Sequence, residues 1–113
     1  MCNQVTLNLI TDKVVRAAKE SLKDKLDKVI LYGSYARGDS DSESDIDIMV
    51  LANIPLVDRN SEREKIRDIV GYVDLDNDVI LSLNVTDSMT FNKYINDLPF
   101  YKNVMKEGVV LSA

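Results

Sequence analysis

The chain contains 113 residues, 45% of them hydrophobic and 29% charged, and carries a formal net charge of -5 at pH 7. This length has room for one modest hydrophobic core, so residues 1–113 are expected to form a single domain. The acidic balance argues against stable non-specific binding of nucleic acid, because such binding needs a basic face that replaces the phosphate counterions.

Residue types that are rare or missing exclude several kinds of site. Cys2 is the only cysteine, and there is no histidine. An intramolecular disulfide, a Ser-His-Asp or Cys-His nucleophilic site and an ordinary zinc site are therefore excluded. The N-terminal residues lack the pattern of a signal peptide, and no apolar run approaches the roughly 20 residues that span a bilayer. We expect a cytoplasmic protein that does not enter a membrane.

The first half of the chain predicts a helix followed by two strands. Apolar residues recur at helical spacing between residues 11 and 27, and Thr11 is the predicted N-cap. Residues 29–32 form a short apolar run that indicates a buried strand. Residues 33–44 are rich in glycine, serine and acidic residues, which favours a loop or a tight strand-to-helix turn. Residues 45–51 begin with alternation and become wholly apolar, as in a largely buried strand.

The second half predicts one more strand among helices. Residues 59–73 place Ile66, Ile69, Val70 and Val73 on one helical face. Residues 79–85 predict a third strand, and residues 88–97 and 100–107 predict short helices. Gly108 is a suitable C′ residue for the last helix, before an apolar stub at residues 109–111. This order of elements predicts an α+β (α/β-like) fold, a small mixed sheet packed with helices.

The acidic loop between residues 33 and 47 has several interpretations. A run of carboxylates is most often a solvated face, but Asp45 and Asp47 lead into an apolar strand, where an unpaired carboxylate is costly. An EF-hand loop that starts at Asp39 would place Ser44 and Val50 where glycine and glutamate are required. A phosphate-binding loop starting at Gly33 would have Asp39 where lysine is required. Both of these interpretations fail.

The remaining interpretation is a metal–phosphate site. Asp45 and Asp47 leave the same face of a strand, with Cα atoms roughly 6–7 Å apart. Carboxylates and phosphate oxygens are the ligands that Mg²⁺ prefers, and Mn²⁺ accepts the same set. Gly33 lets the backbone approach a phosphate closely, and Ser34 offers a hydroxyl and an N–H at the start of a turn.

These residues resemble a known family. Gly33-Ser34, ten further residues and Asp45-x-Asp47 reproduce the G-S-x10-D-x-D signature of the nucleotidyltransferases related to DNA polymerase beta. Residues 31–38 (LYGSYARG) and 44–48 (SDIDI) look like the minimal nucleotidyltransferase branch, often called MNT, and residues 100–108 (FYKNVMKEG) are similar to its C-terminal stretch. The resemblance spans nearly the whole chain.

The resemblance implies a nucleotidyltransferase fold in which Gly33 and Ser34 contact a triphosphate while Asp45 and Asp47 hold magnesium. In this family a hydroxyl attacks the α-phosphate of a nucleoside triphosphate, and pyrophosphate leaves. Members usually carry a third carboxylate on the next strand, where this chain has Ser82. Asp78 at the expected strand start is either an alternative third catalytic residue or a turn residue at the edge of the strand. Arg37 is predicted either to bind a phosphate or to pair with the acidic loop.

Three functional hypotheses follow. By analogy with the family, the first is an antitoxin that transfers AMP from ATP to a hydroxyl of a helical HEPN-type toxin. The second is a catalytically inactive module that neutralises a partner sterically. The third is a free-standing enzyme that adenylylates a small molecule or an RNA end, against which the acidic charge weighs.

Overall fold

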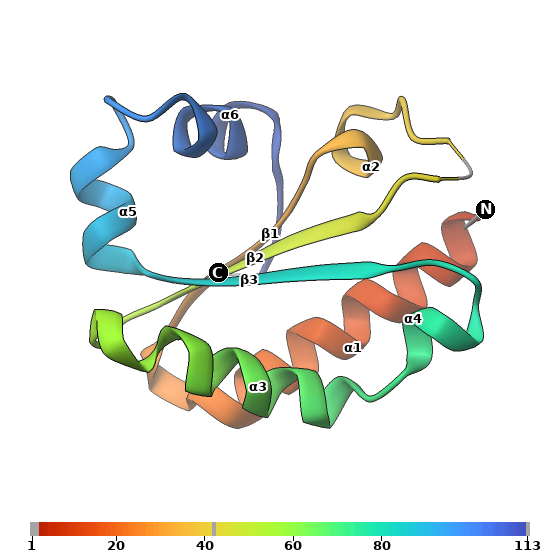
Figure 1. Cartoon of the computed structure of the whole chain (residues 1–113), viewed down its shortest axis with the longest axis horizontal. Helices are drawn as coiled ribbons and strands as arrows, with labels where there is room; N and C mark the ends of the chain where they lie inside the picture. Colours follow the sequence, from red (N-terminus) through yellow and green to blue (C-terminus); the bar gives the residue numbers. More distant parts are fainter. Residues whose placement is uncertain (1–2, 42, 113) are drawn as a thin grey trace.

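The computed structural model describes residues 3–41 and 43–112 as an α+β fold with a four-stranded mixed sheet, as predicted (Figure 1). The elements follow in the order α1 (Gln4–Leu22), η1 (Lys23–Lys25), β1 (Leu26–Tyr32), α2 (Ser34–Arg37), β2 (Ile46–Ala52), η2 (Leu56–Asp58), α3 (Arg59–Val70), α4 (Val73–Asp76), β3 (Leu81–Asp87), α5 (Ser88–Tyr94), α6 (Pro99–Glu107) and β4 (Val109–Ser112).

Helix α1 begins about two turns before the predicted helix. Its N-cap is Asn3, whose Oδ1 accepts a hydrogen bond of 2.9 Å from the Thr6 N–H. The prediction of Thr11 as N-cap is wrong, because Thr11 lies buried inside α1 and its hydroxyl donates to the Asn8 carbonyl. Leu7 and Ile10 extend the buried face toward the N-terminus, and this burial favours the longer helix.

The strands are arranged in the order β3-β2-β1-β4. β1 pairs antiparallel with both β2 and β4, and β2 pairs parallel with β3. The apolar stub expected at residues 109–111 is in the structure a strand, β4, in which Val109 and Val110 pair with Leu31 and Ile30 of β1. Gly108 does end α6, but with an extended φ of -72° rather than the left-handed conformation of a C′ glycine.

The two central strands are apolar on both faces because helices cover both sides of the sheet (Figure 1). On the side of α1 and α3, the main core includes Ile46 and Ile48 of β2. On the side of α5 and α6, a smaller core includes Met49 of β2 and Phe91 of α5. Asp47 lies two residues before Met49 on the same face of β2, so its side chain is at the edge of this smaller core.

Two buried ion pairs join α3 and α4 to β3. Arg67 bonds Asp74 at 2.9 Å, and the buried Asp74 also accepts from the Leu81 N–H at 2.9 Å. Arg59 bonds Asp87 at 2.8 Å, and the same carboxylate caps α5 through the Thr90 N–H. Burial acts to raise the pKa of both carboxyl groups, but these hydrogen bonds outweigh burial and lower each pKa below its usual value. These contacts hold α3 and α4 against β3.

The predicted helix at residues 59–73 is divided in the structure. α3 ends at Val70, where Gly71 has a φ of 70°, and Val73 starts the short helix α4. Ile66 and Val70 are buried as predicted, but Ile69 is exposed. β3 starts at Leu81 rather than Val79, so the turn before it is longer than predicted.

Candidate active site

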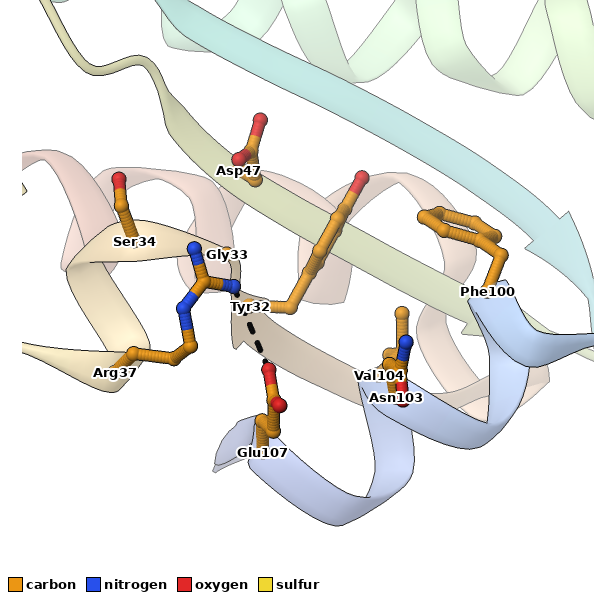
Figure 2. Close-up of a pocket in the computed structure, with 9 residues that line it drawn as sticks. All are labelled: Tyr32, Gly33, Ser34, Arg37, Asp47, Phe100, Asn103, Val104 and Glu107. Carbon is orange, nitrogen blue, oxygen red and sulfur yellow. Dashed lines mark hydrogen bonds and ion pairs between the residues drawn. The ribbon is translucent and has the colours of Figure 1, made fainter. Parts of the chain in front are cut away.

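A pocket of about 380 Å³ opens where β1 turns into α2. Figure 2 shows that its walls come from the end of β1, from α2, from β2 and from α6. Its lining residues are Tyr32, Gly33, Ser34, Arg37, Asp47, Phe100, Asn103, Val104 and Glu107. The structure therefore brings together Gly33, Ser34, Arg37 and Asp47, all of which the sequence predicts as site residues.

Asp45 and Asp47 project from the same face of the sheet, as predicted. The alternate residues Ile46 and Ile48 are buried in the main core on the opposite face. Asp45 directly precedes β2 and is exposed, whereas Asp47 is half-buried. Burial raises the pKa of Asp47 and the negative charge of Asp45 raises it further, while Arg37 opposes the shift. The two carboxylates are thus close enough to repel each other, which is the situation a bound cation relieves.

Gly33 is favoured by its backbone conformation and lies close to Asp47. Its φ of 74° lies in the region that favours glycine, and a Cβ at this position would overlap the Oδ2 atom of Asp47. Tyr32 pairs with Asp47 across the β1–β2 ladder, so the turn that follows Tyr32 meets the carboxylate directly. The glycine and the aspartate of the motif therefore form one packed unit.

Ser34 begins the single turn of α2. The α2 N-cap is Gly33, which has no side chain to cap the helix. The Ser34 hydroxyl has no hydrogen-bond partner among residues 3–41 and 43–112, and it lines the pocket (Figure 2). A hydroxyl in this position is free to bind an anion that enters the pocket.

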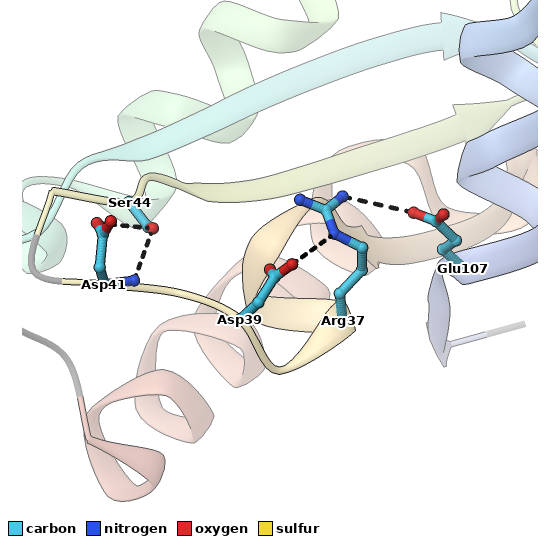
Figure 3. A network of polar contacts seen from close by, with 5 residues as sticks. All are labelled: Arg37, Asp39, Asp41, Ser44 and Glu107. Atoms are coloured by element: carbon cyan, nitrogen blue, oxygen red, sulfur yellow. Dashed lines mark hydrogen bonds and ion pairs between the residues drawn. The ribbon is translucent and has the colours of Figure 1, made fainter.

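Arg37 connects α2 to two acidic side chains. Its Nε atom lies 3.2 Å from Asp39 Oδ2 and its Nη1 atom lies 3.4 Å from Glu107 Oε2 on α6 (Figure 3). The predicted pairing of Arg37 with the acidic loop is therefore present. Its Nη2 atom has no hydrogen-bond partner within the described part of the chain, so one face of the guanidinium is open to the pocket.

Two hydrogen bonds between Asp41 and Ser44 close a turn in the acidic loop (Figure 3). The Asp41 N–H donates to Ser44 Oγ at 2.9 Å, and Ser44 Oγ donates to Asp41 Oδ1 at 3.2 Å. Among the carboxylates of the run, Asp41 thus has a local structural role, and the turn delivers Asp45 to the start of β2.

Asp78 lies outside β3, as its interpretation as a turn residue predicts, and not at the start of the strand. It lies in the turn before β3 with a φ of 54°, is exposed, and lines a separate depression together with Asp45. The residue of β3 that pairs with Asp47 is Ser82. Because paired residues in a parallel ladder point to the same face, Ser82 occupies the place beside Asp47 where a third carboxylate would stand.

The residues available for a metal ion are two carboxylates and not three. Among the described residues, no group of three or more acidic, cysteine or histidine side chains could hold a metal. Asp45 and Asp47 nevertheless fit a divalent cation that takes its other ligands from water and substrate phosphates, the usual coordination of Mg²⁺. The repulsion between Asp45 and Asp47, beside the open hydroxyl of Ser34, makes this end of the pocket the candidate site for a cation and a phosphate.

Five pocket residues were not predicted as site residues: Tyr32, Phe100, Asn103, Val104 and Glu107. Burial and the charge of Asp47 raise the pKa of the Tyr32 hydroxyl, while a hydrogen bond with Asn84 opposes the shift. The other four come from α6, more than 60 residues after Gly33 in the chain. The only signal for them in the sequence is the similarity of residues 100–108 to the family's C-terminal stretch.

Comparisons with known proteins find a matching family model and several named relatives. The model of the nucleotidyltransferase domain family matches residues 12–111. Two relatives from Methanocaldococcus jannaschii, each named "putative protein adenylyltransferase", are 36% identical over 97 residues (86% of this chain, 89% of the relative) and 40% identical over 81 residues (71% and 79%).

Solved structures share the fold. A chain of a toxin–antitoxin complex with AMP-PNP aligns over 91% of this chain and 73% of its own length, with a TM-score of 0.55 and 22% identity. A chain of the complex between the tri-AMPylated HEPN toxin of Shewanella oneidensis and its MNT antitoxin aligns over 94% and 71%, with a TM-score of 0.55 and 21% identity. In the described residues, no helix has the length and apolar character needed to cross a membrane.

Proposed function

This chain belongs to the nucleotidyltransferase domain family, and from that premise we propose that residues 1–113 form a single minimal nucleotidyltransferase domain that transfers AMP from ATP to a partner protein. The observation that carries the proposal is the convergence of Gly33, Ser34 and Asp47, with Asp45 beside them, at one end of the pocket. The general reaction follows from the family. The choice of AMP and of a protein acceptor is supported by the names of the archaeal relatives.

In this proposal the chain's own residues position the triphosphate. Gly33 leaves room for the phosphate beside Asp47, the Ser34 hydroxyl donates to a phosphate oxygen, and the open Nη2 of Arg37 binds another. Asp45 and Asp47 would hold Mg²⁺ or Mn²⁺. A divalent cation bound there supplies charge stabilisation for the attacking and leaving oxygens of the transfer.

The reaction forms a bond between the acceptor hydroxyl oxygen and the α-phosphorus of ATP. The bond from the α-phosphorus to the bridging oxygen breaks, pyrophosphate leaves, and the hydroxyl proton passes to solvent. No histidine is needed, because positioning and electrostatic stabilisation account for most of the catalysis in phosphoryl transfer.

We propose a HEPN-type toxin as the acceptor. One solved complex with the same fold pairs an MNT antitoxin with a tri-AMPylated HEPN toxin. Among residues 3–41 and 43–112, the pocket walls come from the end of β1, from α2, from β2 and from α6, and no separate subdomain covers the pocket. The isolated chain is accordingly expected to turn over ATP slowly, with proximity of the bound partner supplying most of the rate.

The direct test is intact-mass spectrometry of the chain mixed with the product of a neighbouring HEPN gene, ATP and Mg²⁺. We expect the partner to gain the mass of AMP, and Asp45→Asn/Asp47→Asn to abolish both the gain and metal-dependent ATP binding. The matched control Asp12→Asn/Asp24→Asn removes the same charge from exposed positions of α1 and η1 and should retain both.

A non-catalytic binding module is the second candidate, favoured by Ser82 beside Asp47. Inhibition of the partner that persists without any mass gain, and persists with the Asp45/Asp47 double variant, would replace the transferase proposal with this one. The variant Asp78→Asn tests whether Asp78 is a catalytic residue. Transfer of AMP at the wild-type rate by this variant would show that it is not.

A further inference from the structure

The pocket has two chemically different ends. One contains Gly33, Ser34 and Asp47, which suit phosphate and cation. The other is formed by α6, where Phe100 and Asn103 lie on the side of Tyr32 away from Ser34 (Figure 2). A nucleoside triphosphate has the same asymmetry, a charged tail and a flat aromatic base. If the triphosphate lies at Ser34, α6 is the wall that the base meets.

Phe100 has the exposure and support of a stacking platform. It is 47% exposed, and its ring is held edge-on by Tyr32 at 5.7 Å between centroids and contacts Tyr101 at 5.7 Å. These ring contacts fix its orientation, while nearly half of its surface stays open. Aromatic side chains of this kind stack on any nucleobase, because every base has a π-face.

Asn103 supplies a polar group at the same end of the pocket. Its amide has no hydrogen-bond partner within residues 3–41 and 43–112. A carboxamide presents an acceptor and a donor side by side. Adenine matches this pair on both edges, through its amino group and N7 or through its amino group and N1. Guanine matches it at O6 and N1–H, which leaves the 2-amino group without a partner from Asn103, or at the 2-amino group and N3, the edge that adjoins the ribose.

We propose that Phe100 and Asn103 form the nucleobase subsite, in which Phe100 stacks on the base and Asn103 selects adenine. The inference rests on the proposed function, since the direction from phosphate to base is taken from Gly33 and Ser34. It assigns the base preference of the site to one amide on α6.

The test is calorimetric binding of MgATP, MgGTP and Mg-tripolyphosphate to the whole chain. We expect wild type to prefer ATP over GTP by about 10-fold, the discrimination of one good bidentate pair. Asn103→Asp should reverse the order, because a carboxylate accepts from N1–H and the 2-amino group of guanine and repels N1 and N7 of adenine. Phe100→Leu should weaken ATP and GTP equally, by about 10-fold.

Tripolyphosphate has no base and reports on the phosphate end alone. Its affinity should be unchanged in both variants, and Asn92→Asp, an exposed asparagine on α5 outside the pocket, should change no affinity. An unchanged ATP-to-GTP ratio in Asn103→Asp, or an equal loss of tripolyphosphate affinity in both α6 variants, would overturn the base subsite alone. Failure of wild type to bind any of the three ligands would overturn the proposed function and the subsite together.

Discussion

The carboxylate of Asp47 lies so close to the α carbon of Gly33 that a Cβ at residue 33 would overlap Asp47 Oδ2. The two residues are brought together by the antiparallel β1–β2 pair, in which Tyr32 faces Asp47. The glycine of the motif is thus needed both for its positive φ and for the space it leaves to a carboxylate assigned to the metal.

Gly33→Ala tests this contact, and the structure offers a closely matched control. Gly33 and Gly71 have similar backbone angles, φ 74° and ψ -156° against φ 70° and ψ -144°, but a Cβ at Gly71 would meet nothing within 4 Å. Both substitutions should lose about 1–3 kcal/mol of unfolding free energy to backbone strain. Only Gly33→Ala should also displace Asp47 and abolish metal-dependent ATP binding.

Urea unfolding and calorimetry on the two variants measure these effects. If Gly33→Ala binds MgATP as well as Gly71→Ala does, the contact between Gly33 and Asp47 has no role in the site.

Ser34→Ala should weaken triphosphate binding without unfolding the protein. The Ser34 hydroxyl bonds no other described residue, so folding loses little when it is removed. A hydrogen bond to a charged phosphate contributes about 1.5–3 kcal/mol. Calorimetric affinity for MgATP and the melting temperature of the free protein should be measured together. A strongly lowered melting temperature with intact affinity would instead make Ser34 a structural residue.

Asp74→Asn should be the most destabilising of the conservative carboxylate substitutions. Asp74 is fully buried, and its loss of charge leaves Arg67 without its ion-pair partner, while Arg67 Nη1 is already buried without a hydrogen bond. Removing one member of a buried pair costs about 3–5 kcal/mol. Asp76→Asn, an exposed position on the same helix α4, is the control and should be close to neutral in denaturant unfolding.

The lowered pKa values of Asp74 and Asp87 also predict how the unfolding free energy changes in acid. Burial acts to raise the pKa of Asp87, but its bonds to Thr90 and Arg59 outweigh burial, so the pKa lies below the ordinary value of 3.8. A carboxylate with a lowered folded pKa stabilises the fold above the unfolded value, and this contribution is lost as the pH falls through the folded pKa. The unfolding free energy should therefore decrease as the pH drops below about 4.

Asp87→Asn keeps an oxygen that can cap α5 but removes the charge, so its unfolding free energy should fall less steeply with acid than that of wild type. Urea unfolding at a series of pH values makes the comparison. Parallel pH profiles for the two proteins would show that Asp87 is not a source of the acid sensitivity.

Local sequence was sufficient to predict most of the residues at the proposed phosphate end of the pocket. Asp45 and Asp47 share a face because side chains alternate along any strand, and Gly33 starts a turn because its neighbours are an apolar run and a serine. The core strands were likewise predicted from apolar runs. These features depend on residues within a few positions of one another, so the pattern alone determines them.

The rest of the site depends on contacts between distant segments. Arg37 bonds Glu107, 70 residues away, and β4 pairs with the edge of β1 that β2 does not occupy. Strand register places Ser82, and not Asp78, beside Asp47. The packing of α6 brings Phe100 and Asn103 to the pocket. Periodicity along the chain carries no information on which edges pair, in which register, or where a short helix docks; burial and hydrogen bonding across the whole fold decide these.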